Sequence, residues 1–361
     1  MLNLEKQKID ERKKELVNLF LNTKTEKYIL GQNNNAEKLL NTVKDIDGII
    51  DDYTKEKEWK NEKILKHKDI KNKTAIIVSC SLAIYPYTAL NALHKEGFSN
   101  VITILDIVKF SDLNLDIQFL SKANEDIENS FQKYNKIYNL IKEKESKKVF
   151  SDIINFRYSF SLSFMKYYKV DSIGQYFEDF LNLDNEVFVD AGAYDGQTSL
   201  EFIKHCPNYK SVYLFEPSES NLKLAKENLK SYRNINFITK GLSNKKDTLK
   251  FDTESGSASS ISENGTVAID VDTLDTLVDE KVTFIKMDIE GAEGMAIEGM
   301  KEHIKKDYPK MAISVYHKVD DFWKIPEQIF AIRSDYDIYM RHYTEGTDET
   351  VMFFMPSKIR C

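Results

Sequence analysis

The chain has 361 residues, of which 42% are hydrophobic and 12% are aromatic. Because one hydrophobic core stops growing at about 250 residues, this length predicts more than one domain. The 51 Lys and Arg residues are outnumbered by 58 Asp and Glu residues, which gives a net charge of -7. An acidic chain lacks the positive surface of a general nucleic-acid-binding protein, so we expect no nucleic-acid polymer as a partner.

The apolar runs of the sequence are only a few residues long, whereas a membrane-spanning helix needs about 20 apolar residues. Residues 1–20 carry charges throughout and do not have the build of a secretory signal. We therefore expect a cytoplasmic protein that does not act at a membrane. The cysteines, Cys80, Cys206 and Cys361, are odd in number and far apart, which predicts neither a disulfide framework nor a CxxC zinc site.

Residues 1–110 have the pattern of a small Rossmann-like α/β domain. Apolar residues recur at helical spacing before residue 22, which predicts an amphipathic helix that packs on its own domain; a partner-binding or dimer helix is the alternative. Strands and helices then alternate, and this alternation predicts a parallel sheet. The expected strands lie near residues 28–30, 48–50, 75–78 and 101–105, and the expected helices over 36–43 and 87–96.

Two further domains are expected after residue 110. Residues 111–182 are rich in aromatic residues, contain no proline and have a helical pattern, which predicts a helical connector and lid. Residues 183–361 return to alternating strands and helices, and a hairpin is expected from residues 248–251 and 267–271. The strands of this domain are expected near residues 187–190, 212–215, 235–239, 283–288, 310–315, 336–340 and 350–355.

The strongest motif is the segment EVFVDAGAYDGQTSLEF at residues 186–202. A buried strand, a glycine turn and a helix start place a ligand at the carboxyl edge of a parallel sheet. A dinucleotide site needs G-x-G-x-x-G, whereas this turn has two acids that would repel a pyrophosphate. S-adenosylmethionine has no phosphate, and its sulfonium, ammonium and ribose hydroxyls suit carboxylates. The expected cofactor-binding residues here are Asp190, Gly192, Tyr194, Asp195, Gly196 and Thr198.

Two later strand ends extend the expected cofactor site. Glu216 and Pro217 follow the strand 212–215, where a carboxylate can accept both ribose hydroxyls; an ordinary solvated turn is the alternative. Gly241, Leu242 and Ser243 follow the next strand and are expected against adenine, although an ordinary loop fits this segment equally well.

A cluster of acids and a histidine is the candidate catalytic group. Asp288, Glu290 and Glu293 crowd a strand end, which is costly unless a cation or a proton in transit lies among them. An acid-rich helix start is the structural alternative. His317 ends the next strand at the same edge of the sheet, and we expect it to be a second catalytic group rather than a structural histidine.

Together these residues resemble the FkbM family of S-adenosylmethionine-dependent O-methyltransferases over residues 176–355. The resemblance rests on residues 190–196, 215–217, 272–275 and the run Lys-Met-Asp-Ile-Glu-Gly-Ala-Glu at 286–293, with the histidine after the fifth strand. It implies a class I methyltransferase, Rossmann-like fold for residues 183–361 and methylation of a hydroxyl on a polyketide, sugar or glycan precursor. Residues 28–31 and 49–52 are similar to small Rossmann-like modules of bacterial sugar-modifying enzymes, but Gln32 to Asn35 replace the glycines of a dinucleotide fingerprint.

We therefore expect an enzyme that methylates a sugar hydroxyl in a nucleotide-activated sugar or glycan precursor, for capsule, envelope or secondary-metabolite synthesis. The alternatives are an NAD-dependent oxidoreductase and a non-catalytic methyltransferase-like scaffold. A methyltransferase acting on the amines of nucleic acid is disfavoured because the chain has no Pro-Pro segment. Whether the chain forms a homo-oligomer stays open.

Two mechanisms can remove the proton from the acceptor hydroxyl. His317 can act as a direct base, oriented by Asp288 or Glu290, and this is the favoured version. Alternatively, Mg or Mn can lower the pKa of the hydroxyl, with Asp288, Glu290 and His317 as ligands.

Overall fold

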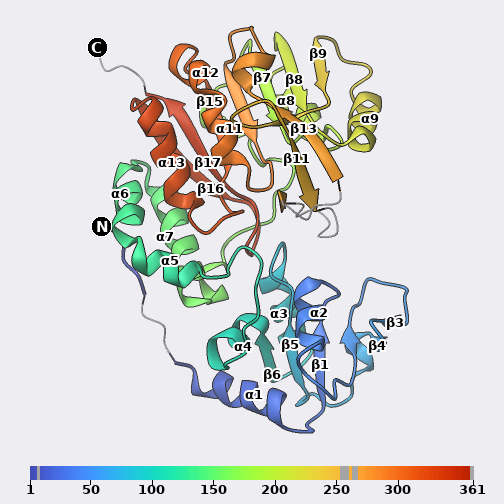
Figure 1. Cartoon of the computed structure of the whole chain (residues 1–361). Helices are drawn as coiled ribbons and strands as arrows, with labels where there is room; N and C mark the ends of the chain where they lie inside the picture. The colour runs from blue at the N-terminus through green and yellow to red at the C-terminus, as the bar shows by residue number, and fades with distance from the viewer. Residues whose placement is uncertain (6–8, 253–259, 262–266, 358–361) are drawn as a thin grey trace.

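The computed structural model describes residues 1–5, 9–252, 260–261 and 267–357. Two α/β units, each built on its own sheet, are joined through a helical segment (Figure 1). None of the helices in these described ranges combines the length and apolar character needed to cross a membrane.

The N-terminal unit contains a six-stranded sheet in the order β3-β4-β2-β1-β5-β6. All neighbouring pairs are parallel except β3 and β4. The amphipathic helix before residue 22 packs within this unit against α4 and β6, as expected from its spacing. The elements are α1 (Glu11–Asn22), β1 (Lys27–Leu30), α2 (Asn34–Leu40), β2 (Ile49–Ile50), β3 (Glu58–Trp59), β4 (Glu62–Leu65), β5 (Ile76–Ser79), α3 (Pro86–Lys95), β6 (Asn100–Thr103) and α4 (Ile104–Phe110).

The expected strand at residues 101–105 is wrong at its end. Thr103 and Asp106 form a capping box, in which each side chain bonds to the backbone of the other residue. This cap starts α4 at Ile104, because it satisfies backbone N–H groups that a longer strand would leave unpaired. The sequence analysis also missed β3 and β4, which are short and partly polar.

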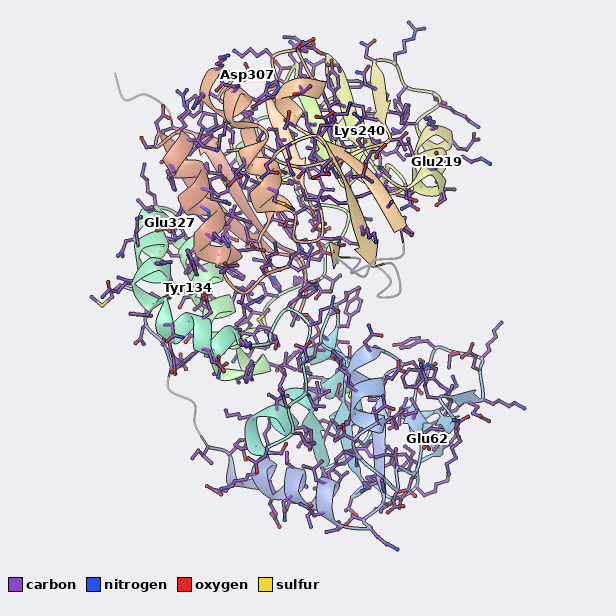
Figure 2. The ribbon with its side chains drawn as sticks, viewed as in Figure 1. Glu62, Tyr134, Glu219, Lys240, Asp307 and Glu327 are labelled. Atoms are coloured by element: carbon purple, nitrogen blue, oxygen red, sulfur yellow. The ribbon has the colours of Figure 1, made fainter. Side chains whose placement is uncertain are left out.

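The helical segment packs mainly against the C-terminal unit (Figure 1). Its helices are α5 (Ala123–Asn129), α6 (Phe131–Leu140) and α7 (Lys144–Ser159), and α6 contacts α13 (Asp321–Ile332). The Tyr134 hydroxyl on α6 is 2.8 Å from the Val319 carbonyl oxygen, and Lys136 forms an ion pair with Glu327 at 3.0 Å. Figure 2 shows Tyr134 and Glu327 on these adjoining helices. The aromatic side chains of this segment thus belong largely to the core.

The C-terminal sheet has seven strands in the order β16-β17-β15-β14-β7-β8-β9. Each strand overlaps the range expected from the sequence. β17 runs antiparallel to both of its neighbours, β15 and β16, and the other neighbouring strands pair in parallel. From β7 the chain builds β8 and β9 on one side and later β14 and β15 on the other, so the crevice between β7 and β14 is a topological switch point. The strands are β7 (Val187–Ala191), β8 (Ser211–Phe215), β9 (Ile235–Ile238), β14 (Phe284–Met287), β15 (Lys310–Ser314), β16 (Tyr336–His342) and β17 (Thr350–Pro356).

A small sheet stands beside this crevice. The expected hairpin is present as β11 and β13, which pair antiparallel from Asp247 opposite Val271 to Phe251 opposite Val267. Its strands are β10 (Gly241–Leu242), β11 (Asp247–Asp252), β12 (Ser260–Ile261) and β13 (Val267–Asp272). The remaining helices of the unit are α8 (Gln197–His205), α9 (Glu219–Asn228), α10 (Leu274–Leu277), α11 (Glu293–Glu298) and α12 (Lys301–Lys306).

One loop links the C-terminal unit directly to the N-terminal one. Residues 343–349, which we call the docking loop, connect β16 to β17. The Thr347 amide donates to the Leu82 carbonyl at 2.8 Å, and the Glu345 carboxylate accepts from the amide and hydroxyl of Thr88 at 2.7 and 2.6 Å. Glu345 thereby supplies a partner at the start of α3, where helix amides are otherwise free.

Candidate functional site

A pocket of about 1340 Å³ lies at the carboxyl edge of the C-terminal sheet. Figure 2 shows Glu219 and Lys240 on the side of the unit where the small sheet and α9 lie. Eight of the expected site residues line the pocket from the ends of β7, β8 and β14, their following turns and β10: Gly192, Tyr194, Glu216, Pro217, Gly241, Leu242, Asp288 and Glu290. Glu290 lines the pocket beside Asp288, so the expected cofactor site and catalytic cluster share one cavity.

The glycine turn after β7 is held in place by close packing. Gly192 has φ +78°, and a Cβ added there would lie 1.8 Å from the carbonyl oxygen of Asp288. Only glycine allows this approach between the turns after β7 and β14. Gly196 has φ +81°, and a Cβ there would meet Leu229 and Ala225 at 3.0 and 3.1 Å. The turn therefore fixes the pocket wall against both β14 and α9.

Asp190 supports this turn from beneath and does not line the pocket. Its side chain is fully buried, lies 3.2 Å from the Lys286 ammonium and accepts a 2.7 Å hydrogen bond from the Ser199 hydroxyl. Lys286 in turn donates to the Gly192 carbonyl at 2.7 Å. Direct contact of Asp190 with a cofactor therefore does not fit its position, whereas fixing the glycine turn does. Lys286 was part of the family motif in the sequence, but no role was expected for it.

Glu216 ends β8 with its carboxylate in the pocket wall. It accepts hydrogen bonds from the backbone amides of Tyr194 at 3.0 Å and Ser218 at 2.9 Å. Burial raises the pKa of Glu216, while the hydrogen bonds from Ser218 and Tyr194 oppose that effect. The Asn221 side-chain amide also donates to Oε1, at 3.4 Å, whereas Oε2 accepts from Tyr194 and keeps a lone pair for a ligand hydroxyl.

Besides Asp190, four expected cofactor residues lie outside the described pocket lining: Asp195, Gly196, Thr198 and Ser243. Asp195 instead accepts from the Gln197 amide at 3.1 Å at the start of α8. The Ser243 amide donates to the Asp272 carbonyl at 2.9 Å and so holds the end of β10 to β13. These residues shape the local structure around the pocket.

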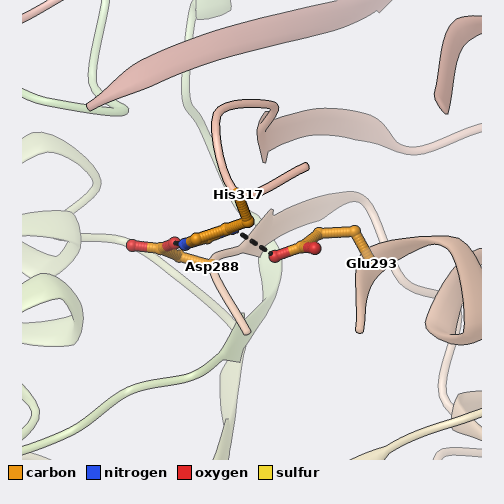
Figure 3. A group of neighbouring side chains, drawn as sticks. All are labelled: Asp288, Glu293 and His317. Carbon is orange, nitrogen blue, oxygen red and sulfur yellow. Dashed lines mark ion pairs between the residues drawn. The ribbon is translucent and has the colours of Figure 1, made fainter. Parts of the chain in front are cut away.

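The expected catalytic residues converge on His317, whose side chain is 2% exposed. Nε2 of His317 lies 3.3 Å from Asp288 Oδ1 and 3.4 Å from Glu290 Oε2. Nδ1 lies 3.0 Å from Glu293 Oε1 on the opposite side of the ring. Figure 3 shows the imidazole between Asp288 and Glu293. The structure thus brings together all four side chains, from the loop after β14, the start of α11 and the loop after β15.

These surroundings change the protonation of the cluster. Burial alone would lower the pKa of His317, but Glu293, Asp288 and Glu290 together raise it to about 10. Burial raises the pKa of Glu290 to about 8. An imidazole with such a pKa holds a proton at neutral pH, so His317 would have to lose this proton before it could act as a base; its catalytic role stays a prediction.

Several residues around the cluster were missed because they come from distant parts of the chain. The Tyr176 hydroxyl donates to Asp288 Oδ2 at 2.9 Å, and the Phe119 ring packs edge-on against His317. Burial raises the pKa of Glu349 on the docking loop to about 7, and that of Asp321 on α13 also to about 7. No local motif marks these positions, since only the fold brings them to the site.

Comparisons with known proteins agree with this geometry. Residues 190–345 match the family model of the methyltransferase FkbM domain. The whole chain is similar in structure to methyltransferase FkbM from Methylobacillus flagellatus KT, with a TM-score of 0.80 and 21% sequence identity over 96% of this chain and 94% of that chain. At this identity the similarity shows a shared fold. Together the matches confirm the FkbM resemblance and the class I methyltransferase fold expected from the sequence.

Other solved structures match more weakly. Precorrin-6y C5,15-methyltransferase from Geobacter metallireducens GS-15 has a TM-score of 0.30 and 16% identity over 48% of this chain and 78% of its own. Fibrillarin from Aeropyrum pernix has a TM-score of 0.33 and 12% identity over 48% of this chain and 68% of its own. None of the curated proteins matches the chain significantly.

Proposed function

Residues 190–345 form an FkbM methyltransferase domain, and from this premise we propose that the chain transfers a methyl group from S-adenosylmethionine to a sugar hydroxyl. The observation that carries the proposal is that Glu216 and Asp288 line the same pocket. A ribose-binding carboxylate and a cluster able to handle a proton thus face one cavity. The NAD-dependent alternative is set aside by the family match.

The pocket suits S-adenosylmethionine in size and chemistry. Ligand sites usually measure about 300 to 1000 Å³, so a cavity of about 1340 Å³ has room for this cofactor and part of an acceptor. Glu216 would accept the ribose hydroxyls, and Gly241 and Leu242 would lie against adenine. Asp190 would act indirectly, by holding Lys286 and through it the glycine turn. The bound cofactor would supply an electrophilic methyl group.

The acceptor must reach the methyl group beside an acidic cluster. Transfer would form the O–CH₃ bond as the S–CH₃ bond of the bound cofactor breaks and leaves its electron pair on sulfur. The hydroxyl proton would pass to a carboxylate oxygen of Asp288 or Glu290, which line the pocket. Asp288 and Glu290 can accept hydrogen bonds from sugar hydroxyls and hold the oxygen in line with the methyl group. The same carboxylates would repel a phosphate placed next to them. The pyrophosphate of a nucleotide-activated sugar would therefore lie away from this cluster.

The direct test pairs cofactor binding with an acceptor panel. Calorimetry should show binding of S-adenosylhomocysteine, and methyl transfer should be seen with free sugars, glycan precursors or nucleotide-activated sugars. Transfer to phenols alone would refute the sugar assignment. Binding of the cofactor without transfer to any hydroxyl acceptor would favour the non-catalytic scaffold. A cytoplasmic location, a role in capsule or polysaccharide synthesis and any homo-oligomer stay predictions.

A further inference from the structure

We propose that the chain binds a divalent transition-metal ion of the Mn²⁺ type through Nε2 of His317, Oδ1 of Asp288 and Oε2 of Glu290. This site deepens the proposed function, because the ion would lie where the acceptor oxygen is expected. Ion binding itself depends only on the geometry of the three side chains.

Two of the three separations between the donor atoms, both measured from Nε2 of His317, are those that a shared ion requires. Two ligands about 2.1 Å from one ion, at an angle of about 90° to 110°, lie about 3.0 to 3.4 Å apart. Nε2 of His317 is 3.3 Å from Asp288 Oδ1 and 3.4 Å from Glu290 Oε2. Among the described residues, Nε2 and Oδ1 are buried and have no hydrogen-bond partner. Unpartnered buried donors that converge on one point indicate a ligand between them.

The remaining polar atoms of two of these ligands lie beside neighbouring side chains. The Tyr176 hydroxyl donates to the other Asp288 oxygen, Oδ2, at 2.9 Å. Glu293 Oε1 lies 3.0 Å from Nδ1 of His317, which has no hydrogen-bond partner among the described residues. An ion at Nε2 would displace the proton there, and Glu293 would keep the remaining ring proton on Nδ1. A carboxylate behind a histidine and a hydrogen bond behind a ligating carboxylate are typical of metal sites, since they orient the ligands.

Glu293 itself fits this outer role better than direct ligation. In the alternative set of His317, Asp288 and Glu293, three ligand atoms lie within 4.8 Å of one another. However, Glu293 faces the opposite ring nitrogen from Asp288. Its Oε1 also accepts from the Ile289 amide at 3.0 Å, and its side chain is 1% exposed. Glu290, at 31% exposed, lines the pocket through which an ion would enter.

The donor set favours Mn²⁺ over Mg²⁺. Mg²⁺ prefers oxygen ligands and gives up its water reluctantly, whereas first-row transition metals accept imidazole nitrogen together with carboxylate oxygen. An ion held at the pocket wall would lower the pKa of an acceptor hydroxyl bound to it. Its three protein ligands would leave positions open for that hydroxyl.

The test measures Mn²⁺ binding to the full chain after treatment with EDTA and removal of the chelator. Calorimetry and the loss of the free Mn²⁺ signal in electron paramagnetic resonance should both report one ion per chain. Mg²⁺ should bind at least about tenfold more weakly, as expected for a site with one nitrogen ligand. No binding of Mn²⁺, or equal binding of Mg²⁺, would overturn the proposal.

Variants identify the ligands. His317→Ala, Asp288→Asn and Glu290→Gln should each weaken Mn²⁺ binding by about a hundredfold or more, whereas Glu293→Gln should cost about tenfold, as expected for an outer partner. Asp270→Asn, which removes a charge elsewhere on the pocket wall, is the matched control and should keep the parental affinity. Equal affinity in the control and the ligand variants would contradict the site. Circular dichroism checks that each variant is folded. Glu290 is the most exposed of the three ligands, so Glu290→Gln should stay folded and still test the site if the variants at the buried ligands unfold.

Binding of S-adenosylhomocysteine to the same samples separates the two proposals. Cofactor binding without Mn²⁺ binding would refute the metal site and leave the methyltransferase proposal intact. Mn²⁺ binding without cofactor binding would refute the methyltransferase proposal alone.

Discussion

At the scale of single residues, Asp190 acts on the glycine turn through Lys286, whose ammonium lies 3.2 Å from the Asp190 carboxylate and donates to the Gly192 carbonyl at 2.7 Å. Asp190 was expected to hold the cofactor, either by accepting from it or less directly by fixing the glycine turn. The structure turns it inward, where it pairs with Lys286. Sequence spacing places a residue at the edge of a sheet, but the direction of its side chain depends on a partner that is 96 positions away.

The buried pair of Asp190 and Lys286 makes a stability prediction. Lys286→Met should destabilise the chain by about 3 to 5 kcal/mol, because it leaves the Asp190 carboxylate buried without its partner. Urea unfolding followed by circular dichroism measures this change. The matched control is Lys245→Met, which breaks an exposed pair with Asp247 and should cost less than about 1 kcal/mol. Equal effects of the two substitutions would mean that the buried pair does not support the turn.

Glu216 makes a binding prediction. Glu216→Ala should weaken S-adenosylhomocysteine binding by at least about tenfold, because charge-assisted hydrogen bonds contribute about 1.5 to 3 kcal/mol each. Isothermal titration calorimetry measures the affinity. Glu227→Ala, on the exposed side of the following helix, is the control and should bind like the parent. An unchanged affinity for Glu216→Ala would show that ribose binds elsewhere.

His342 on β16 makes the pH prediction. Burial lowers its pKa to about 3, from 6.5 in the unfolded chain. Between pH 3 and 6.5, His342 therefore binds a proton in the unfolded chain but not in the folded one. The contribution of neutral, buried His342 to the free energy of unfolding is fully present above pH 6.5 and is lost as the pH falls toward 3. His342→Gln should remove a slope of up to about 1.4 kcal/mol per pH unit in that range. Unfolding midpoints between pH 4 and 7 test this; the exposed control His205→Gln should keep the parental slope.

At the scale of elements, the strands of the C-terminal sheet were predictable because short apolar runs between turn residues are local signals. The boundary between β6 and α4 was not, because Ile104 and Leu105 continue an apolar run and only the capping box ends the strand. The short strands β3 and β4 carry polar residues and depend on pairing within the sheet for their existence. Pairing between segments leaves little trace in the sequence of either one.

The turn between β7 and α8 can be tested by a matched pair of glycines. Gly192 and Gly97 both have positive φ, but a Cβ at Gly97 would meet no atom within 4 Å. Gly97→Ala should therefore lower the free energy of unfolding by only about 1 to 2 kcal/mol, which is the cost of holding an alanine in the left-handed conformation. Gly192→Ala should cost more and also weaken S-adenosylhomocysteine binding, because its Cβ would push the turns after β7 and β14 apart. Equal losses of stability, with cofactor binding intact, would contradict this packing.

At the scale of the whole molecule, the site depends on segments that no local motif connects. Tyr176 lies before the C-terminal sheet, Asp321 starts α13, and Glu349 lies on the docking loop, yet all three surround the same cluster. The family motifs at residues 190–196 and 286–293 were visible because each lies within one strand and its turn. The acidic side chains of Asp321 and Glu349 reach the cluster only through tertiary packing, so the sequence could not predict their position there.

The docking loop carries Glu349 and is hydrogen-bonded to the N-terminal unit, and this connection gives the last prediction. A Cβ on Gly346 would lie 1.8 Å from the Leu82 carbonyl oxygen and 2.2 Å from that of Ala83, so Gly346→Ala must move the loop away from the N-terminal unit. Asp348 and Glu349 follow directly and interact electrostatically with Asp288. Methyl transfer by Gly346→Ala should therefore fall by about tenfold or more, as expected when acceptor-positioning groups shift by about 1 Å.

Binding of S-adenosylhomocysteine by this variant should stay at the parental level, because the loop does not line the described pocket. Gly294→Ala is the control for an added methyl group, since the Cβ there would meet only the flexible end of Gln328 at 3.1 Å. If Gly346→Ala transfers methyl groups as fast as the parent, the N-terminal unit acts independently of the catalytic centre. A loss of rate with intact cofactor binding would instead mean that docking of the two units sets the acceptor side of the site.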